Sequence, residues 1–359
     1  MTAFGGRYRG RRVLVTGHTG FKGSWLAAWL QRLGAEVYGY SLAPASDQAH
    51  WHALQLSIDA TEGDLADAER LTALIRRSRP EIVFHLAAQP LVRKSYAEPL
   101  VTWATNVMGT AHLLEACRHE SAVRAIVAVT TDKVYANREW NWGYREIDAL
   151  GGHDPYSAAK AAMELLCDSY RQAFYAAKDG PLLATARAGN VIGGGDWSVD
   201  RLLPDAWRAL RRGEELQIRS PNAIRPWQHV LDCLSGYLLI GQRLLEGDSE
   251  VARAWNLGPA VTDTRRVAEV LLALTRHWPE LRWRATDGAG ELHETGQLQL
   301  DSAQARSRLG WLPVWTFDQA LTATAEWYWQ QASGRLLTFD QLDAYRTAAT
   351  GAVWTRPCN

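Results

Sequence analysis

Tyr156 and Lys160 form the pair of residues in this 359-residue sequence that is best suited to acid–base chemistry. In a helix, residues four apart lie on one face, so the lysine ammonium can approach the tyrosine phenol. A nearby positive charge favours phenolate and lowers the pKa of a tyrosine from about 10. The tyrosine can then take a proton from a substrate hydroxyl while hydride leaves the same carbon. YxxxK pairs are also common on solvated helix faces. The surrounding sequence must therefore distinguish a catalytic pair from a solvated one.

A glycine-rich turn near the N-terminus favours the catalytic interpretation. Gly17, Gly20 and Gly23 follow a predicted strand, Arg12–Thr16, in a turn that opens into a predicted helix, 22–33. Glycines let the backbone approach a pyrophosphate closely, and a helix N-terminus supplies amide donors and a favourable dipole. A strand before the turn and a helix after it are typical of a dinucleotide site. The other residues of the turn that we expect to contact the dinucleotide are Thr19, Phe21 and Lys22.

Later segments of the sequence also suit the predicted dinucleotide site. Asp64 lies where an acid could accept the adenine amino group, although capping of the next helix is an equally good interpretation. The predicted strand 82–86 leads into the small residues Ala87 and Ala88, as a strand tip beside a cofactor requires, and simple packing is the alternative. The second predicted strand, 37–41, ends without an acid for a ribose 2′-hydroxyl or an arginine for a 2′-phosphate, so NAD and NADP both stay open. The further cofactor contacts that we expect are Asp64, Leu65, Leu86, Ala87, Ala88, Gln89 and Asn106.

The elements that must position these residues alternate along the first half of the chain. Nearly continuous apolar strands that alternate with amphipathic helices indicate a parallel sheet covered on both faces. We therefore predict an α/β fold: a Rossmann-type doubly wound parallel sheet over residues 1–190, to which some later segments return. Residues 191–359 are expected to form mainly a smaller mixed α/β substrate-binding domain. The remaining predicted strands are 125–130 and 182–186, and the remaining predicted helices are 65–77, 102–118 and 156–177.

A second polar cluster follows the predicted strand 125–130. Thr131, Asp132 and Lys133 would emerge at its carboxyl end, where ligands bind in open α/β sheets. An alcohol dehydrogenase or epimerase needs only a hydroxyl residue beside the tyrosine–lysine pair. An additional acid and base suit the elimination of water, in which one group removes a proton from carbon and the other protonates a leaving hydroxyl. The alternative for Asp132 and Lys133 is a helix-capping acid and a surface lysine.

The glycine turn and the YxxxK pair together resemble the extended short-chain dehydrogenase/reductase superfamily over essentially the whole chain. Within it, residues 131–133 resemble the sugar-nucleotide 4,6-dehydratases, in most of which the acid–base pair is Asp-Glu rather than Asp-Lys. The Asp-Lys pair is similar to that of the CDP-glucose 4,6-dehydratases. The opening GHTGFKGSWLAAWL and the stretches 137–146, 151–160 and 224–230 also resemble the CDP-glucose 4,6-dehydratases.

The resemblance implies a reaction cycle that uses NAD and ends without net redox change. Tyr156 would deprotonate the glucose 4-hydroxyl, to which Thr131 hydrogen-bonds, while hydride passes from C4 to the cofactor. Lys133 would take the acidic C5 proton, and Asp132 would protonate the departing 6-hydroxyl. Hydride would then return to C6 and give a 4-keto-6-deoxy sugar.

The two phosphates of such a nucleotide-sugar substrate need positive partners. Arg225 is the first candidate because guanidinium binds phosphate in bidentate fashion, and Arg201 is the second. A surface arginine is the alternative for each. The aromatic segment 138–146 could close over the glucosyl group and exclude water. The resemblance adds further residues expected to face the substrate, namely Asn190, Asn256 and His293, the last of which also suits a surface His-Glu pair.

Composition narrows the class of protein. Basic and acidic residues number 39 each, which leaves no basic footprint for nucleic acid or a membrane surface. The four cysteines are scattered, no histidine spacing suggests a metal site, and no apolar run reaches transmembrane length. We expect a cytoplasmic enzyme without a metal, nucleic-acid or membrane partner. By analogy with related enzymes, a homodimer is expected through the helices 102–118 and 156–177.

Two other functions stay open. A nucleotide-sugar 4-epimerase or decarboxylase would share the glycines, the tyrosine and the lysine, but it would not use Asp132 and Lys133 as an acid–base pair. A cofactor-sensing binding module would be expected to have lost part of the Thr131, Tyr156 and Lys160 site, and all three residues are present.

Overall fold

The computed structural model describes residues 3–176, 180–286 and 296–355, and its centre is a seven-stranded parallel sheet. The strand order is β10-β6-β5-β4-β1-β2-β3. The first, fourth and fifth strands are almost wholly buried, which explains their continuous apolar sequences. The reversal of strand order between β1 and β4 is that of a Rossmann fold, as predicted. The strands are β1 (Arg12–Thr16), β2 (Glu36–Ser41), β3 (Asp59–Glu62), β4 (Ile82–His85), β5 (Ala125–Val129), β6 (Leu182–Ala188) and β10 (Ala254–Leu257).

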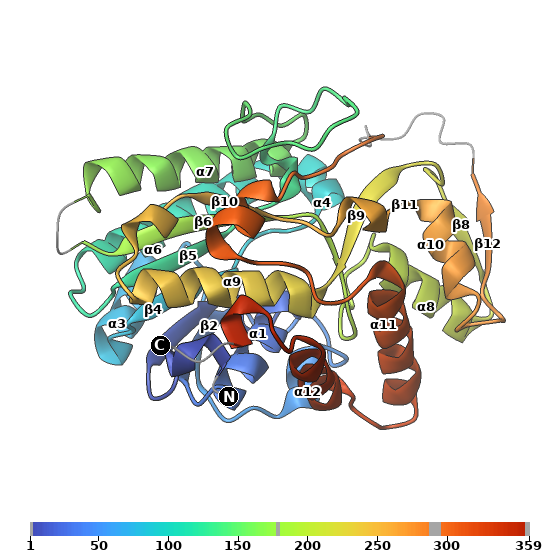
Figure 1. The fold of residues 1–359 in the computed structure, drawn as a ribbon, viewed down its shortest axis with the longest axis horizontal. Coiled ribbons are helices and arrows are strands. Elements are labelled where there is room, and N and C mark those ends of the chain that lie inside the picture. Colours follow the sequence, from blue (N-terminus) through green and yellow to red (C-terminus); the bar gives the residue numbers. More distant parts are fainter. Residues whose placement is uncertain (1–2, 177–179, 287–295, 356–359) are drawn as a thin grey trace.

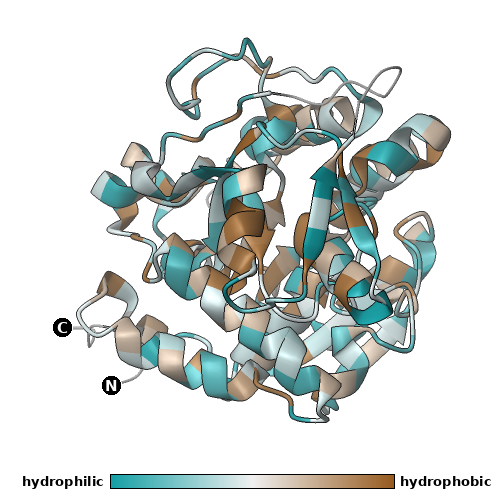
Figure 2. Ribbon diagram, turned by 90° about the vertical axis from the view of Figure 1, so that its right-hand side faces the viewer, coloured by the Kyte–Doolittle hydropathy of each residue, from teal (hydrophilic) through white to brown (hydrophobic). Residues whose placement is uncertain are grey.

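Helices cover both faces of this sheet (Figure 1). One face carries α1 (Phe21–Arg32) and α9 (Val230–Leu245), and the other carries α3 (Ala68–Ser78), α6 (Gly109–Arg118) and α7 (Pro155–Ala173). Side chains that alternate along β1 enter separate hydrophobic clusters: Val13 and Val15 join one, and Leu14 joins the other. Figure 2 shows the hydrophobic residues gathered on the inner elements.

The second half of the chain builds two small sheets and also returns to the main one. A three-stranded sheet has the order β11-β9-β7, and a two-stranded sheet pairs β12 with β8. Both α9 and β10 belong to the main sheet's layers although they follow residue 190. The strands are β7 (Asn190–Ile192), β8 (Glu215–Ile218), β9 (Ile224–His229), β11 (Thr264–Arg266) and β12 (Arg282–Ala285). The helices are α8 (Leu202–Arg212), α10 (Val267–Leu274), α11 (Phe317–Ala332) and α12 (Thr338–Ala348).

Three predicted helices differ from those observed, and one of them, 156–177, ends as α7 already at Ala173. The predicted helix 102–118 is instead α5 (Pro99–Trp103), a π-helical turn η2 (Ala104–Met108) and then α6. The predicted helix 65–77 begins only at Ala68, because the Asp67 carboxylate caps it by accepting a hydrogen bond from the Arg70 amide at 2.9 Å. The shorter helices are η1 (Ala3–Gly6), α2 (His50–Leu54), α4 (Val92–Ala97), η3 (Asp132–Val134), η4 (Ser249–Val251), η5 (Val261–Asp263), η6 (Ala305–Leu309) and η7 (Val353–Thr355).

Candidate active site

The glycine turn between β1 and α1 is shaped by two close backbone approaches. Gly17 has φ +75°, and a Cβ atom there would lie 2.7 Å from the amide nitrogen of Ala87. A Cβ atom on Gly23 would lie 2.0 Å from the Gly17 carbonyl oxygen. Gly20 is the N-cap residue of α1, and no side chain of the described residues caps this end of the helix. The first amides of α1 are therefore left for a ligand, which suits an anion.

The other residues of the turn have contacts of different kinds. The Thr19 hydroxyl lies 2.7 Å from that of Ser41 and so ties the turn to the end of β2. Phe21 lies close to the backbone of Gly193, where a Cβ atom would be 3.1 Å from the phenyl ring. The half-buried Lys22 places its amine over the ring of the buried Tyr237, 6.0 Å from the ring centroid.

The residues predicted to contact adenine lie in a turn before α3. The exposed Asp64 carboxylate accepts a hydrogen bond from the Ala66 amide at 2.9 Å. Because Asp67 is the N-cap of α3, capping of that helix does not account for Asp64. Leu65 is buried against Gly109 of α6, where a Cβ atom would lie 2.6 Å from the leucine Cβ.

The end of β4 is held by Asn106, which lies in the π-helical turn. Its side-chain oxygen accepts from the Gln89 amide at 2.8 Å, and its side-chain nitrogen donates to the Gln89 carbonyl at 3.1 Å. The Gln89 side chain in turn bonds to the backbone of Leu91. Asn106 therefore fixes the backbone that follows Leu86, Ala87 and Ala88, the strand tip expected beside the cofactor.

The helix that carries Tyr156 and Lys160 begins immediately before the tyrosine. Asp154 caps α7 by accepting from the Ser157 amide at 2.9 Å, and Pro155 occupies the first helical position. The Tyr156 amide donates to the Ser95 hydroxyl of α4 at 3.1 Å. These contacts place the predicted pair on the buried face of α7, one turn apart, beside the end of β5.

Burial, rather than Lys160, has the largest effect on Tyr156. Burial raises the pKa of Tyr156, whereas the Arg201 charge and a hydrogen bond with Thr131 lower it. We expected Lys160 to lower this pKa, but its amine donates to the Val129 carbonyl at 3.0 Å. Burial and the nearby charge of Lys22 lower the pKa of Lys160 to about 8.

Thr131, Asp132 and Lys133 lie together at the carboxyl end of β5, as predicted. The Asp132 carboxylate is fully buried, and its Oδ1 accepts from the Thr131 hydroxyl and from the Lys133 amine, each at 3.0 Å. The Lys133 side chain is 27% exposed. Among the described residues, Asp132 Oδ2 has no hydrogen-bond partner, and it faces Gly189, where a Cβ atom would be 3.3 Å away. Helix-capping therefore does not explain Asp132; Thr131 caps η3 instead.

The residues predicted to bind the substrate differ in how near they lie to the catalytic residues. Arg201 lies close enough to Tyr156 to affect its pKa, and it directly precedes α8. Asn190 begins β7, beside the Gly189 backbone that Asp132 faces. Arg225 in β9 donates to the Ile224 and Gly296 carbonyls at 2.9 and 3.3 Å. His293 lies outside the described residues.

Asn256 is buried, and its side chain holds other parts of the protein. Its oxygen accepts from the Tyr135 hydroxyl at 2.6 Å, and its nitrogen donates to the Tyr144 and Asp301 carbonyls at 2.7 and 3.1 Å. This residue therefore organises the segment after η3, which rises above α7 in Figure 1.

The aromatic segment 138–146 is a stack of rings rather than an isolated loop. The ring centroid of Trp140 lies 4.9 Å from that of Trp142 and 5.2 Å from that of Tyr144. The Tyr144 ring stacks on the Tyr135 ring with centroids 5.0 Å apart. Tyr144 also pairs through its backbone with residues 299–301. Trp142, at the outer end of the stack, is 59% exposed.

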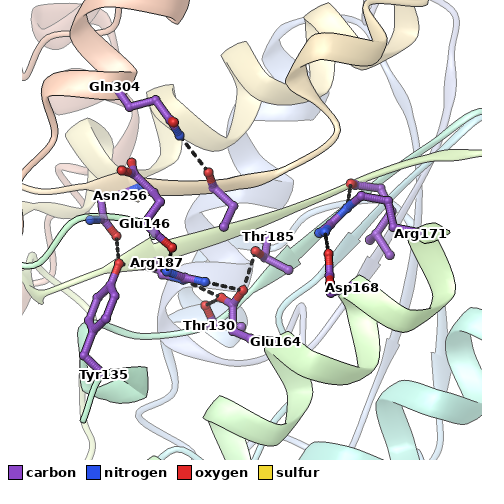
Figure 3. Close-up of polar contacts among 12 residues, drawn as sticks. Thr130, Tyr135, Glu146, Glu164, Asp168, Arg171, Thr185, Arg187, Asn256 and Gln304 are labelled. Carbon is purple, nitrogen blue, oxygen red and sulfur yellow. Dashed lines mark hydrogen bonds and ion pairs between the residues drawn. The ribbon is translucent and has the colours of Figure 1, made fainter. Parts of the chain in front are cut away.

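Sequence reasoning missed one buried ionisable pair next to this site. Glu164 of α7 and Arg187 of β6 form an ion pair at 2.9 Å and are almost completely buried (Figure 3). Two signals were available: Glu164 follows Tyr156 and Lys160 at the same four-residue spacing, and Arg187 is the one charged residue in the strand LLATARA.

The chain is similar to known proteins along most of its length. Residues 14–324 match the family of GDP-mannose 4,6 dehydratase. The chain belongs to the GDP-mannose 4,6-dehydratase family. It is 42% identical over 352 residues to a CDP-glucose 4,6-dehydratase of Salmonella typhimurium (strain LT2), covering 96% of this chain and 98% of that protein. The predicted relationship to the sugar-nucleotide 4,6-dehydratases is therefore confirmed.

Solved structures agree with this family assignment. DesIV, a dTDP-glucose 4,6-dehydratase from Streptomyces venezuelae solved with NAD bound, has a TM-score of 0.76 at 25% identity, over 90% of this chain and 98% of that one. The epimerase Mth375 from Methanothermobacter thermautotrophicus has a TM-score of 0.81 at 23% identity, over 94% of this chain and 96% of that one, which shows a shared fold. Among the described residues, no helix is long and apolar enough to cross a membrane, and no group of three acidic, histidine or cysteine side chains could hold a metal ion.

Proposed function

We propose that this member of the family is an NAD-dependent CDP-glucose 4,6-dehydratase that forms CDP-4-keto-6-deoxy-D-glucose. The observation that carries the proposal is the meeting of two pairs at one sheet edge: Tyr156 with Lys160, and Asp132 with Lys133. The first pair suits oxidation at C4, and the second suits loss of water across C5 and C6. The 42% identity to a CDP-glucose 4,6-dehydratase along nearly the whole chain supports the same reaction and the same nucleotide.

The glycine turn fits the pyrophosphate of NAD. Gly17 and Gly23 leave no room for a side chain, and the uncapped N-terminus of α1 offers amide donors. The related dehydratase DesIV was solved with NAD bound, which supports NAD as the cofactor here. When bound, NAD supplies an acceptor for the C4 hydride and returns that hydride to C6.

Oxidation at C4 is assigned to Tyr156, which removes the proton of the 4-hydroxyl. Thr131 lies beside it and bonds to the same hydroxyl, while Arg201 favours the phenolate that the step requires. Lys160 is buried one helical turn after the tyrosine, and its amine donates to the Val129 carbonyl at 3.0 Å.

Elimination is assigned to Asp132 and Lys133. One proton transferred across the 3.0 Å contact from the Lys133 ammonium to the Asp132 carboxylate gives a neutral amine and a neutral acid. The total number of protons in the pair does not change, and the pair is neutral as a whole before and after the transfer. The amine can then accept the C5 proton, and the acid can protonate the departing 6-hydroxyl, which restores the original ion pair.

The substrate's diphosphate is assigned to Arg201 and Arg225, and its sugar to the space near Asn190 and the segment 138–146. Arg201 already lies near Tyr156, so a diphosphate bound there would bring the glucosyl group close to the catalytic residues. In this proposal residues 191–359 mainly bind the nucleotide sugar, while α9 and β10 complete the NAD-binding half.

A homodimer is the proposed assembly. Exposed apolar side chains lie on α5, η2 and α7, among which α7 contacts the other two. Leu100 is 82% exposed, and Val101, Met108 and Leu165 are at least half exposed. A second copy of the chain would cover these residues. Light scattering should give twice the chain mass, and Leu100→Glu should shift it toward one chain.

The decisive experiment compares CDP-, dTDP-, UDP- and GDP-glucose with purified protein and NAD or NADP. Conversion is followed by the strong alkaline ultraviolet absorbance of 4-keto-6-deoxy sugars. CDP-glucose with NAD should be converted fastest. Absence of this absorbance with every nucleotide-glucose would exclude the dehydratase, and formation of the 4-epimer instead would establish the epimerase.

A further inference from the structure

Glu164 and Arg187 form a fully bonded ion pair behind the candidate active site (Figure 3). One carboxylate oxygen accepts from Arg187 Nε at 3.0 Å and the other from its terminal nitrogen at 2.9 Å. The same two oxygens also accept from the hydroxyls of Thr130 at 2.5 Å and Thr185 at 2.7 Å. Every oxygen of this buried carboxylate therefore has two donors, which is the condition under which a polar network rigidifies its surroundings.

The Glu164–Arg187 pair contacts residues on both sides of the acid–base segment 131–133. Thr130 directly precedes Thr131, and its hydroxyl is held by Glu164. Tyr135 lies two residues after Lys133, and its hydroxyl accepts from Arg187 at 2.8 Å. The Arg187 guanidinium also lies over the Tyr135 ring, 5.0 Å from its centroid. Both contacts are made by residues next to the segment, so neither occupies the atoms assigned to the reaction.

The pair also joins this segment to its catalytic neighbours. Glu164 lies one turn after Lys160 on α7, the helix that carries Tyr156. Arg187 donates to the Glu146 carbonyl at 3.1 Å, and Tyr135 donates to Asn256, so the aromatic segment 138–146 is held by the same network. One ion pair thus fixes the helix of the oxidising pair and the strand end of the eliminating pair relative to each other.

Stability alone does not explain such a pair. A buried ion pair often contributes no more than apolar residues of the same volume, because desolvation offsets the Coulomb attraction. What it adds is a specific geometry, because four hydrogen bonds fix the Glu164 carboxylate and two more, to Tyr135 and Glu146, fix the Arg187 guanidinium.

We propose that Glu164 and Arg187 are positioning residues that clamp both ends of segment 131–133 and hold Asp132 and Lys133 in register with Tyr156. The proposal rests on the proposed function for the chemical roles of the clamped residues. It requires that loosening either end slow the reaction without weakening the binding of cofactor or substrate.

The test compares variants of the clamp with a matched control on the same helix. Thr130→Val loosens one end and Tyr135→Phe the other, and both leave the ion pair itself in place. Glu164→Gln removes the charge, but it leaves a buried guanidinium unpaired and so can prevent folding. The control is Asp168→Asn, one turn after Glu164 on α7, which removes the charge of the half-exposed Asp168 and with it the 2.6 Å ion pair to Arg171 (Figure 3).

Two measurements are made on each variant of the full-length protein. Hydrogen–deuterium exchange of the substrate-free protein reports the amides of residues 130–136, and steady-state kinetics with CDP-glucose separate kcat from KM. We expect the clamp variants to exchange faster at 130–136 and to lose about 10- to 100-fold in kcat, because small displacements of reacting groups cost this much. KM and NAD affinity should stay within about threefold, and Asp168→Asn should match the wild type in both measurements.

Each departure from this pattern contradicts the clamp. Unchanged exchange at 130–136 in both Thr130→Val and Tyr135→Phe would show that the network does not hold the segment, whatever happens to kcat. Faster exchange with an unchanged kcat would show that the held geometry does not matter to the reaction. If the wild type converts no nucleotide-glucose, the proposed function fails, and the exchange data still decide whether the clamp exists.

Discussion

Replacement of Lys133 by methionine separates the two halves of the proposed reaction. Methionine keeps most of the side-chain length and removes the amine that lies 3.0 Å from Asp132. The oxidising residues are untouched, since the Lys133 amine bonds to Asp132, whereas Tyr156 and Lys160 are held by Ser95 and Val129. The variant should therefore oxidise C4 and stop before elimination.

The magnitude follows from the role of a general base. Such a group typically contributes about 100- to 10,000-fold, or about 3–5 kcal/mol of barrier, to the step it serves. Elimination should slow by this factor, while the Lys133 side chain, already 27% exposed, leaves no large cavity when it is shortened. The Thr131 hydroxyl still donates to Asp132, so the acid keeps one hydrogen bond.

The assay is a single turnover in D₂O with CDP-glucose and bound NAD. Reduced cofactor, followed at 340 nm, should accumulate in Lys133→Met, and deuterium at C5 should fall far below the wild-type level. Lys94→Met is the control, because it breaks a comparable ion pair with Glu98, 3.5 Å long, on the exposed face of α4. Undiminished deuterium incorporation at C5 in Lys133→Met would refute the assignment of Lys133 as the base.

Three further predictions concern other parts of the molecule. Tyr156→Phe should lower kcat by about 100- to 10,000-fold with no accumulation of reduced cofactor, and accumulation in a single turnover would contradict its role in oxidation. Gly17→Ala should unfold at lower temperature and bind NAD more weakly in calorimetry than Gly10→Ala. Both glycines have positive φ, but an added Cβ meets Ala87 only at the first, so equal effects would disprove the close-approach argument. Burial raises the pKa of Asp232 to about 7, so its contribution to stability is present at low pH and is lost as pH rises from about 4 to 7, by up to about 4 kcal/mol. Asp232→Asn should reduce this pH dependence of the unfolding free energy. The prediction fails if denaturant titrations give the same difference in unfolding free energy between pH 5 and pH 8 for the variant and the wild type.

The main sheet and the catalytic pairs were predictable because their signals are local. A parallel strand buried on both faces is a short apolar run, and the run before Thr131 identifies both β5 and the place where its following side chains emerge. The capped start of α7 likewise lies within three residues of Tyr156. In each case the residues that create the geometry are neighbours in the sequence.

The supporting contacts were not predictable because their partners are distant. Glu164 and Arg187 are 23 residues apart, and Asn256 is 121 residues from Tyr135. Asn106 is predicted to contact the cofactor, and that stays a prediction; what the sequence did not indicate is that its side chain bonds to the backbone of Gln89. A polar residue in an apolar stretch indicates that some partner exists, but only the fold determines which one.

The Asp-Lys pair, which departs from the Asp-Glu pair common among the sugar-nucleotide 4,6-dehydratases, is chemically equivalent to it in proton count. Elimination needs one protonated and one unprotonated group at the start. Two buried carboxylates reach that state by taking up a proton, because two adjacent negative charges repel each other. A carboxylate beside an ammonium already holds the proton and needs only to move it across the 3.0 Å contact between Asp132 and Lys133. The pair is therefore neutral as a whole in both forms, which allows Asp132 to remain fully buried. In the proposed reaction, Lys133 is thus the residue that supplies the proton with which Asp132 acts as an acid.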